Sequence, residues 1–342
     1  MYRKIMGFLE AWKESEHRKP LILQGARQVG KTYSILEFGR THYENVAYFN
    51  FETNPKLNET FEENISPDYL IPILSHIAGQ TIVTEKTLIV FDEVQLCERA
   101  LTSLKYFCEN APDYHIIVAG SLLGVAVNRA KFSFPVGKVD MKTLYPMDME
   151  EFMLALGEDD LVEQIKKCFQ TDTPLPSALH DAAMQLYRQY LVVGGMPECV
   201  MQFAETKDYI LVRHTQDTIL ASYLNDMSKY NNLNEIKKTR LAYDNITVQL
   251  SKKNTRFQYK LIKKGGRASE FENAIEWLCL SGIVSQVYKV EQIKKPLENY
   301  RDIDAFKIYV SDLGLLCAKK DLAANDILYI CLLYTSPSPR DS

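Results

Sequence analysis

Residues 20–32 read Pro-Leu-Ile-Leu-Gln-Gly-Ala-Arg-Gln-Val-Gly-Lys-Thr. The last eight residues of this stretch fit the pattern GxxxxGK[ST]. A short apolar run before them predicts a buried strand, and a helical pattern follows from Lys31 to Arg40. Glycines between a strand and a helix let backbone N–H groups wrap around phosphates at the positive end of the helix dipole. The alternative, a glycine-rich turn without a ligand, is disfavoured by this context.

The expected nucleotide contacts cover the whole loop. Lys31 should reach the β- and γ-phosphates, and the Thr32 hydroxyl should coordinate magnesium. Arg27 has two open interpretations, contact with a phosphate in a neighbouring subunit or packing at the surface. The candidate binding residues are Gly25, Ala26, Arg27, Gln28, Val29, Gly30, Lys31, Thr32 and Tyr33.

Two carboxylates follow a second buried strand, Thr87 to Phe91. Asp92 is placed to hold the magnesium ion, directly or through water, and Glu93 is placed to orient and deprotonate the attacking water. Alone, such a pair only marks the end of a strand. Downstream of a phosphate-binding loop it predicts the second half of a site that hydrolyses a nucleoside triphosphate.

Two further polar residues lie at predicted strand ends. Ser121 follows the strand from His115 to Ala119 and is a candidate to sense the γ-phosphate. Asn50 lies at the end of the strand from Val46 to Phe51, and we expect it to hydrogen-bond Glu93 and restrain it. For both residues the alternative is a turn or a helix cap.

Composition bounds the class of protein. The 342 residues suffice for two or three domains, and a net charge of −4 leaves no global basic field for nucleic acid or an anionic membrane. The seven cysteines show neither zinc-ligand spacing nor pairing, which fits a reducing compartment. The N-terminus lacks the apolar core of a secretory signal, and no run approaches the roughly 18 apolar residues of a membrane helix. We therefore expect a cytoplasmic protein.

The order of elements predicts an α/β fold. Residues 1–150 alternate apolar runs with helical patterns, as in a parallel sheet, with a fifth strand expected around Val136 to Leu144. Beyond residue 150 helices dominate, interrupted by Gly194-Gly195-Met-Pro197. Residues 233–290 follow a helix, turn, helix and strand pattern.

Several motifs together resemble a large group of prokaryotic AAA+-type P-loop ATPases with a C-terminal domain of unknown function. The resemblance implies an AAA+ ATPase core at 1–150, a helical connector at 151–232 and a winged-helix-like part at 233–330. Relatives often carry arginine where this chain has Lys138, which puts a trans-acting role for that position in doubt. The matching segments are 18–32, Phe91-Asp-Glu-Val-Gln95, Ala119-Gly-Ser-Leu-Leu123, Leu144-Tyr-Pro-Met-Asp-Met-Glu-Glu-Phe152, Tyr190-Leu-Val-Val-Gly-Gly-Met-Pro-Glu198 and Val310-Ser-Asp-Leu-Gly-Leu315.

The last residues have a different character. Cys331 to Asp341 reads like a translated sequencing adapter, so we expect residues 331–342 to be an artefact and the natural protein to continue past about Ile330. The alternative is a genuine Ser/Pro-rich terminus.

Nucleic-acid binding is not favoured for the second half. Seven basic residues between Lys252 and Arg267 would suit phosphate contacts, but the following helix carries Glu270, Glu272 and Glu276. Phe271, Ile275 and Leu278 at helical spacing indicate a packed core.

Two classes of function remain open. The first is magnesium-dependent ATP hydrolysis that drives a conformational change in the attached C-terminal module. The second is a slow nucleotide-gated switch, or a DNA-associated ATPase, whose winged helix binds a protein partner or DNA. ATP is favoured over GTP because no NKxD-type guanine-reading motif is present. A homo-oligomer or a protein partner bound through the C-terminal domain is the expected assembly.

Overall fold

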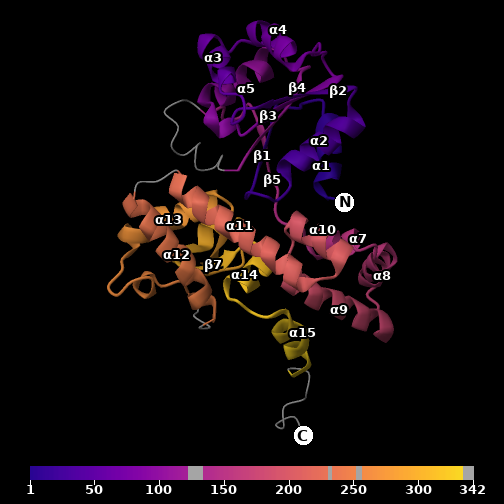
Figure 1. Cartoon of the computed structure of the whole chain (residues 1–342), viewed down its shortest axis with the longest axis vertical. Helices are drawn as coiled ribbons and strands as arrows, with labels where there is room; N and C mark the ends of the chain where they lie inside the picture. The colour runs from indigo at the N-terminus through magenta and orange to yellow at the C-terminus, as the bar shows by residue number, and fades with distance from the viewer. Residues whose placement is uncertain (122–133, 230–232, 252–255, 334–342) are drawn as a thin grey trace. The chain divides into compact units, whose positions relative to one another are not determined.

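The computed structural model describes residues 1–121, 134–229, 233–251 and 256–333. They form two compact units, Arg3–Tyr145 and Pro146–Ser342 with Met1–Tyr2 (Figure 1). The two units divide between Tyr145 and Pro146. The domain bounds expected at 1–150, 151–232 and 233–330 stay predictions. Within the described ranges, no helix is both long and apolar enough to cross a bilayer.

The first unit contains a five-stranded sheet of order β2-β3-β4-β1-β5, and every strand pair in it is parallel. The predicted parallel α/β core is therefore confirmed. Its elements are α1 (Ile5–Lys13), β1 (Leu21–Gln24), α2 (Lys31–His42), β2 (Asn45–Asn50), α3 (Lys56–Glu63), α4 (Pro67–Ala78), β3 (Thr87–Asp92), the 3-10 turn η1 (Val94–Leu96), α5 (Glu98–Asn110), β4 (His115–Gly120) and β5 (Asp140–Thr143).

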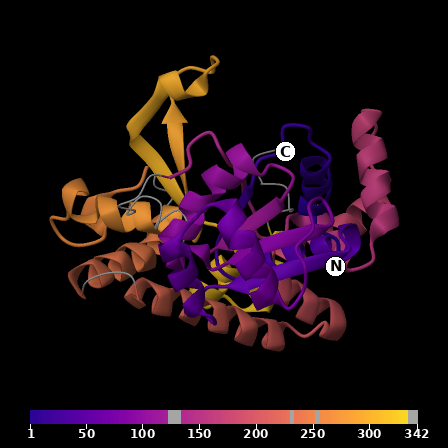
Figure 2. The same cartoon turned by 90° about the horizontal axis from the view of Figure 1, so that it is seen from above.

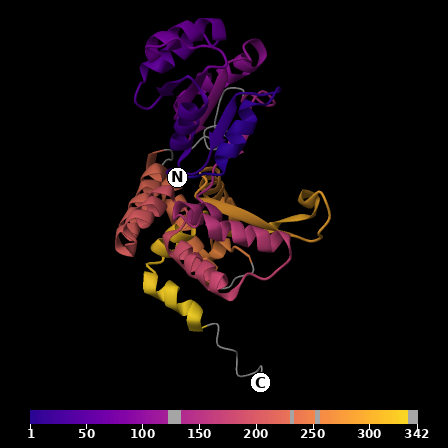
Figure 3. The same ribbon diagram turned by 90° about the vertical axis from the view of Figure 1, so that its right-hand side faces the viewer.

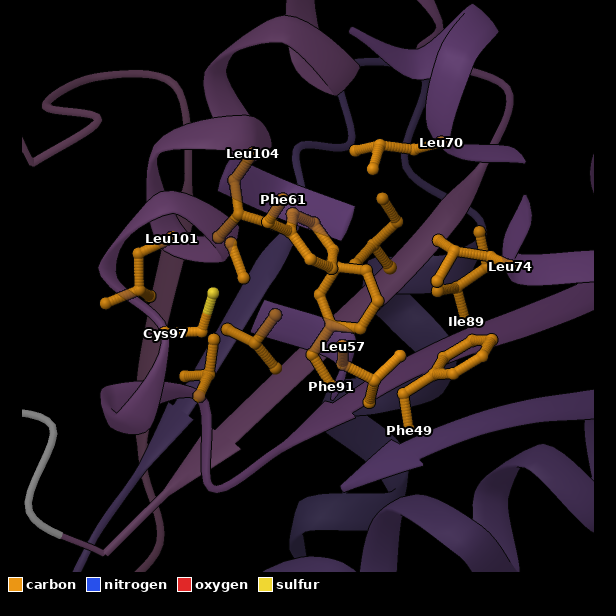
Figure 4. Packing of buried hydrophobic residues seen from close by; sticks show 14 of the residues in the cluster. Phe49, Leu57, Phe61, Leu70, Leu74, Ile89, Phe91, Cys97, Leu101 and Leu104 are labelled. Carbon is orange, nitrogen blue, oxygen red and sulfur yellow. The ribbon is translucent and has the colours of Figure 1, made fainter. Parts of the chain in front are cut away.

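Both faces of this sheet are covered, which explains why β3 and β4 are buried along their whole lengths. Helices α3, α4 and α5 pack on one face through a continuous apolar cluster (Figure 4). Phe61 and Phe91 lie within it, edge to face, with ring centroids 5.6 Å apart. Burying one such side chain contributes roughly 1.5–3 kcal/mol.

Helix α1 precedes the sheet and was not predicted from the sequence. It buries Ile5, Leu9 and Trp12, which recur at helical spacing on one face. The Trp12 ring meets His115 at the start of β4, with centroids 6.1 Å apart. Trp12 Nε1 also donates to the carbonyl of Lys19 (2.9 Å), which ties α1 to the segment just before β1.

His115 is a buried titratable group in this unit. Its side chain is 3% exposed, and its Nδ1 lies 2.7 Å from the hydroxyl of Tyr43. Burial, with the nearby positive charges of Arg18 and Lys13, lowers the pKa of His115 to about 4. An unfolded histidine titrates near 6.5, so the unfolded chain binds more protons between these values. The stability from a neutral His115 is therefore present above about pH 6.5 and lost as pH falls.

We expect the first unit to lose on the order of 2 kcal/mol of unfolding free energy between pH 7 and pH 5 through this one residue. Urea unfolding at the two pH values measures the loss. His115→Gln keeps a hydrogen-bonding side chain without the titration and should reduce the difference. An equal pH dependence in wild type and variant would contradict the assignment.

The second unit is mostly helical, as predicted for the C-terminal part. Its helices are α7 (Met149–Ala155), α8 (Asp159–Gln170), α9 (Ser177–Val193), α10 (Pro197–Thr206), α11 (Tyr209–Lys229), α12 (Leu233–Ser251), α13 (Ala268–Leu280), α14 (Leu313–Lys319) and α15 (Ala324–Leu333), with 3-10 turns η2 (Tyr259–Leu261) and η3 (Leu297–Tyr300) and an antiparallel pair, β6 (Val284–Val290) and β7 (Arg301–Val310).

Helices α12 and α13 and the β6–β7 hairpin follow one another within this unit. The hairpin projects away from these helices in two perpendicular views (Figures 2 and 3). On α13, Phe271, Ile275 and Leu278 are buried, which confirms that they belong to the core, whereas Glu272 and Glu276 are exposed. The sequence predicted only the last three residues of β7, because the earlier ones alternate charged and apolar residues on a strand largely open to solvent.

Two of the sequence motifs meet at a tight junction in this unit. Gly194 ends α9 with a φ of 76°, which favours glycine, and Gly195 N donates to Asp312 Oδ2 (2.6 Å). Asp312 also caps α14, because its Oδ1 accepts from Leu315 N (2.8 Å). Gln216 Nε2 donates to two carbonyls at the end of α9. The junction therefore fixes α9, α11 and α14 together.

The predicted tail falls almost entirely outside the described residues. The backbone of α15 continues to Leu333, three residues past Ile330, and 334–342 are not described. The adapter interpretation stays a prediction.

Candidate nucleotide-binding site

The loop from Gly25 to Thr32 joins the end of β1 to the start of α2, as the sequence predicted. Gly25 and Gly30 have φ values of 146° and 88°, which favour glycine. A Cβ at Gly25 would lie 3.2 Å from the carbonyl carbon of Leu144 and closer still to its oxygen. The backbone therefore turns tightly beside the segment after β5, and α2 begins immediately after the turn.

Arg3 fastens this loop and was not singled out from the sequence. Its side chain is 4% exposed and donates to the carbonyl of Val29 inside the loop and to the carbonyl of Tyr145, each at 2.9 Å. An arginine with two fixed backbone acceptors holds the loop against the chain that leaves the sheet. No local motif identifies such a residue, because its partners lie 26 and 142 positions away.

Lys31 lies within the turn of the loop. Its Nζ donates to the carbonyls of Gly25 (2.9 Å) and Ala26 (2.8 Å). Burial lowers the pKa of the Lys31 ammonium to about 8. A lysine that is desolvated in this way is held by neutral carbonyl dipoles, so phosphate oxygens would be much stronger partners.

Thr32 and Asp92 come together at the carboxyl ends of the strands. Thr32 Oγ1 donates to Asp92 Oδ2 (2.8 Å), and Glu93 N donates to Asp92 Oδ1 (2.9 Å). Asp92 is 5% exposed. A hydroxyl that donates its proton to a carboxylate keeps its lone pairs for a metal, and magnesium prefers such oxygen ligands. These residues fit the predicted magnesium position.

The rest of the coordination shell would come from phosphates and water. In the described part of the chain, no group of three or more His, Cys, Asp or Glu side chains is arranged to hold a metal. This pattern suits magnesium, which keeps several waters and binds through one or two protein groups plus substrate phosphates.

Glu93 directly follows β3 in an unusual backbone conformation. Its φ of 52° and ψ of 38° lie in the left-handed region, which costs about 1 kcal/mol or more for a residue other than glycine. Burial raises the pKa of Glu93 from its ordinary value. A strained, partly desolvated carboxylate next to a candidate metal ligand is the arrangement expected of a general base.

The predicted bond from Asn50 to Glu93 is replaced by other contacts. Asn50 Oδ1 accepts from the backbone N–H groups of Glu52 (2.8 Å) and Thr53 (3.0 Å), and Asn50 Nδ2 donates to the Tyr48 hydroxyl (3.2 Å). The side chain is captured by its own turn, as asparagine at the end of a strand often is. Glu93 instead accepts a hydrogen bond from Gln95.

Ser121 follows β4, which lies between β1 and β3 in the sheet. It is 5% exposed, and its hydroxyl has no hydrogen-bond partner among the described residues. Its position at the carboxyl end of this strand is compatible with the predicted γ-phosphate contact, which stays a prediction. The segment directly after it, 122–133, is not described.

The remaining predicted residues differ in their exposure. Gln28 has a φ of 66° at the tip of the loop, Arg27 is half-buried, and Tyr33 is 56% exposed on the first turn of α2. Lys138, where arginine was expected, pairs with Glu109 on α5 at 3.0 Å. Lys138 therefore has an ion-pair partner within its own chain.

Models of known protein families match both halves of the chain. Residues 17–153 match the family described as AAA domain, and residues 184–326 match a family described as domain of unknown function DUF8612. The chain is an AAA-domain protein with a C-terminal domain of unknown function. Within the curated proteins, none matches it.

Comparison with solved structures finds a similar fold with a TM-score above 0.5. A Walker-type ATPase of Pyrococcus abyssi has a TM-score of 0.57 at 13% identity, covering 93% of this chain and 95% of that one. The ORC2 protein of Aeropyrum pernix in its ADPNP and ADP complexes has a TM-score of 0.48 at 12% identity, with 97% and 95% covered. RuvB of Thermotoga maritima has 0.36 at 14% identity, with 98% and 94% covered. The likeness to the Pyrococcus protein shows the fold alone.

Proposed function

We propose that the AAA domain binds ATP with magnesium and hydrolyses it, and that turnover changes the conformation of the attached C-terminal domain. The observation that carries this proposal is the hydrogen bond between Thr32 and the buried Asp92, 2.8 Å long and beside the loop, with Glu93 next in the chain. This set supplies a phosphate-binding turn, a metal position and a base at one edge of one sheet.

Each residue has a distinct role in this proposal. Lys31 would exchange its carbonyl partners for oxygens of the β- and γ-phosphates, and Thr32 and Asp92 would hold magnesium, which would neutralise phosphate charge. Glu93 accepts the proton of the attacking water. Ser121, whose hydroxyl has no described partner, donates to the γ-phosphate. The cytoplasm remains the expected compartment.

Replacing Lys31 tests nucleotide binding directly. ATP with magnesium at about 100 times its dissociation constant should stabilise wild type by about 2.7 kcal/mol and raise the melting temperature by about 5 °C. Lys31→Ala should abolish the shift, because it removes the charge that meets the phosphates. Lys86→Ala is the control, since Lys86 pairs with Glu44 on the surface at the start of β3. Equal shifts in Lys31→Ala and wild type would refute the site.

The alternative is a switch in which ATP occupancy sets a partner site and hydrolysis is slow. Steady-state release of phosphate from wild type distinguishes the two. Hydrolysis that drives a conformational change should release phosphate continuously, whereas a slow switch should release it only rarely. The strained, partly buried Glu93 favours turnover.

For the C-terminal domain we propose a protein partner or a second copy of the chain rather than DNA. A groove of about 1070 Å3 runs beside α13 and the β6–β7 hairpin. Its charged border mixes three basic residues with three acidic ones, Arg256, Lys260, Arg267, Glu272, Glu276 and Asp304. A surface that tracks phosphates needs one sign of charge, so this balance supports a winged-helix-like segment used for packing. Lys252 and Lys253 of the basic run lie outside the described residues.

A further inference from the structure

The two acidic residues of the site each accept a hydrogen bond from a neutral side chain to which the sequence analysis gave no role. Tyr48 on β2 donates its hydroxyl hydrogen to Asp92 Oδ2 (2.8 Å), the same oxygen that accepts from Thr32. Gln95 Nε2 donates to Glu93 Oε2. These contacts come from different elements and act on different carboxylates.

The direction of the Tyr48 hydroxyl is fixed by its second partner. Asn50 Nδ2 is a donor and lies 3.2 Å from the Tyr48 oxygen, so this oxygen accepts from Asn50 and its own hydrogen is left for Asp92. Strand β2 pairs with β3 in a register that places Asn50 opposite Asp92, which brings the tyrosine two residues earlier within reach. Asp92 Oδ2 thus receives two hydroxyl hydrogens, from Thr32 and Tyr48, which restrict how its carboxylate can turn.

The Gln95 contact is local to one short turn. Glu93 caps the 3-10 turn Val94–Leu96, and Gln95 lies in the middle of it. Because donor and acceptor belong to the same turn, they move together, and the bond cannot report a displacement between strands. This geometry fits a constant support for the carboxylate better than a restraint released by a signal. With Oε2 occupied by the amide, Oε1 of Glu93 remains to accept from water.

We propose that Tyr48 and Gln95 are positioning residues of this site, Tyr48 for the magnesium-binding carboxylate Asp92 and Gln95 for the general base Glu93. The inference rests on the proposed function. It assigns the two side chains to different steps: Tyr48 acts on how tightly magnesium is held with ATP, and Gln95 acts on the rate of the chemical step. Partners that orient ligating carboxylates are typically worth 10- to 100-fold in metal affinity or activity.

Tyr48→Phe removes the hydroxyl and keeps the ring. The magnesium concentration at which ATP gives half of its full thermal shift should rise about tenfold. The same increase should appear in the magnesium dependence of hydrolysis, and excess magnesium should recover the lost rate. Tyr69→Phe is a matched control, because Tyr69 donates to Glu63 on the surface of the same unit. Its magnesium dependence should equal that of wild type.

Gln95→Met keeps the length of the side chain and removes the donor. We expect kcat to fall about tenfold at saturating magnesium. A positioned general base raises the rate by about 10²- to 10⁴-fold, and loss of its support should remove part of that gain. KM and the magnesium dependence of the thermal shift should stay unchanged. Gln95→Glu, which keeps the shape but places a second negative charge beside Glu93, should also lower kcat and serves if the methionine variant does not fold.

The two sets of variants should change different quantities: Tyr48→Phe the magnesium dependence, and the Gln95 variants kcat. This difference separates a positioning role from a general loss of stability. A fall in stability alone would affect magnesium dependence and kcat alike in both variants. An unaltered magnesium dependence in Tyr48→Phe, or an equal or higher kcat in both Gln95 variants, would overturn the inference while wild type still binds and hydrolyses ATP. A wild type without any magnesium- and ATP-dependent shift would instead refute the proposed function.

Discussion

Replacing Glu93 with glutamine is expected to lower kcat for ATP hydrolysis by about 100-fold or more while ATP with magnesium still stabilises the protein. Glutamine keeps the shape of the side chain but cannot accept a proton from water. Asp92 and Thr32, joined at 2.8 Å, stay in place to hold magnesium. Binding and chemistry should therefore separate in this one variant.

Phosphate release at saturating ATP measures the rate, and the ATP-dependent melting shift measures binding. Glu44→Gln is a suitable control, because Glu44 is an exposed partner of Lys86 on the same unit. A rate equal to that of wild type would show that another group activates the water. Loss of both rate and binding would show that Glu93 supports the site rather than the chemistry.

The second large effect is expected at the junction in the C-terminal domain. Gly195→Ala should destabilise this unit by about 3 kcal/mol or more, because the new Cβ would lie 2.8 Å from both the carbonyl carbon and the nitrogen of Met147, and closer still to its oxygen. Met147 N also donates to the Gly195 carbonyl (2.7 Å), so neither segment can move away without breaking a hydrogen bond.

Asp312→Ala tests the same junction without adding atoms. Asp312 is 4% exposed, and burial raises its pKa from the ordinary value. Its loss would leave Gly195 N and the first turn of α14 without their acceptor, at about 1–3 kcal/mol for each buried donor. Thermal and urea unfolding, followed by circular dichroism, should show that the C-terminal unit unfolds at a lower temperature and a lower urea concentration. The stabilisation of the AAA domain by ATP should persist.

The matched control is Asp181→Ala, since Asp181 is exposed on α9 of the same unit and lies 3.7 Å from the exposed His180. Its effect should be small. Unchanged stability in both Gly195→Ala and Asp312→Ala would mean that the junction does not hold the helices of this domain together.

Much of the nucleotide site could be predicted because its signals are local in the chain. The loop Gly25–Thr32 and the pair Asp92–Glu93 each occupy a few consecutive residues at the carboxyl end of a buried strand. Parallel strands carry their carboxyl ends to the same edge of a sheet, so the two segments share that edge, and the strand order then sets the distance between them. The strands and helices of the first unit followed from the same periodicity, apart from α1.

The roles of the surrounding side chains depended on distances that no local pattern encodes. Asn50 has the expected position, but its own turn captures its carbonyl oxygen, and Gln95 reaches Glu93 in its place. Arg3 fastens the loop across 26 and 142 residues of chain. Tyr48 contacts Asp92 only because β2 pairs with β3 in one register.

The glycine-rich loop, the acidic pair and the α/β class could be predicted from the sequence, because each follows from neighbouring residues and the geometry of a single strand or turn. The strand order, the hydrogen bond between Gly195 and Asp312, and the side chains that contact Asp92 and Glu93 depend on tertiary packing. Those contacts join residues far apart in the chain or depend on which rotamer packing allows, and a hydrogen bond forms only within a few tenths of an ångström of its ideal length.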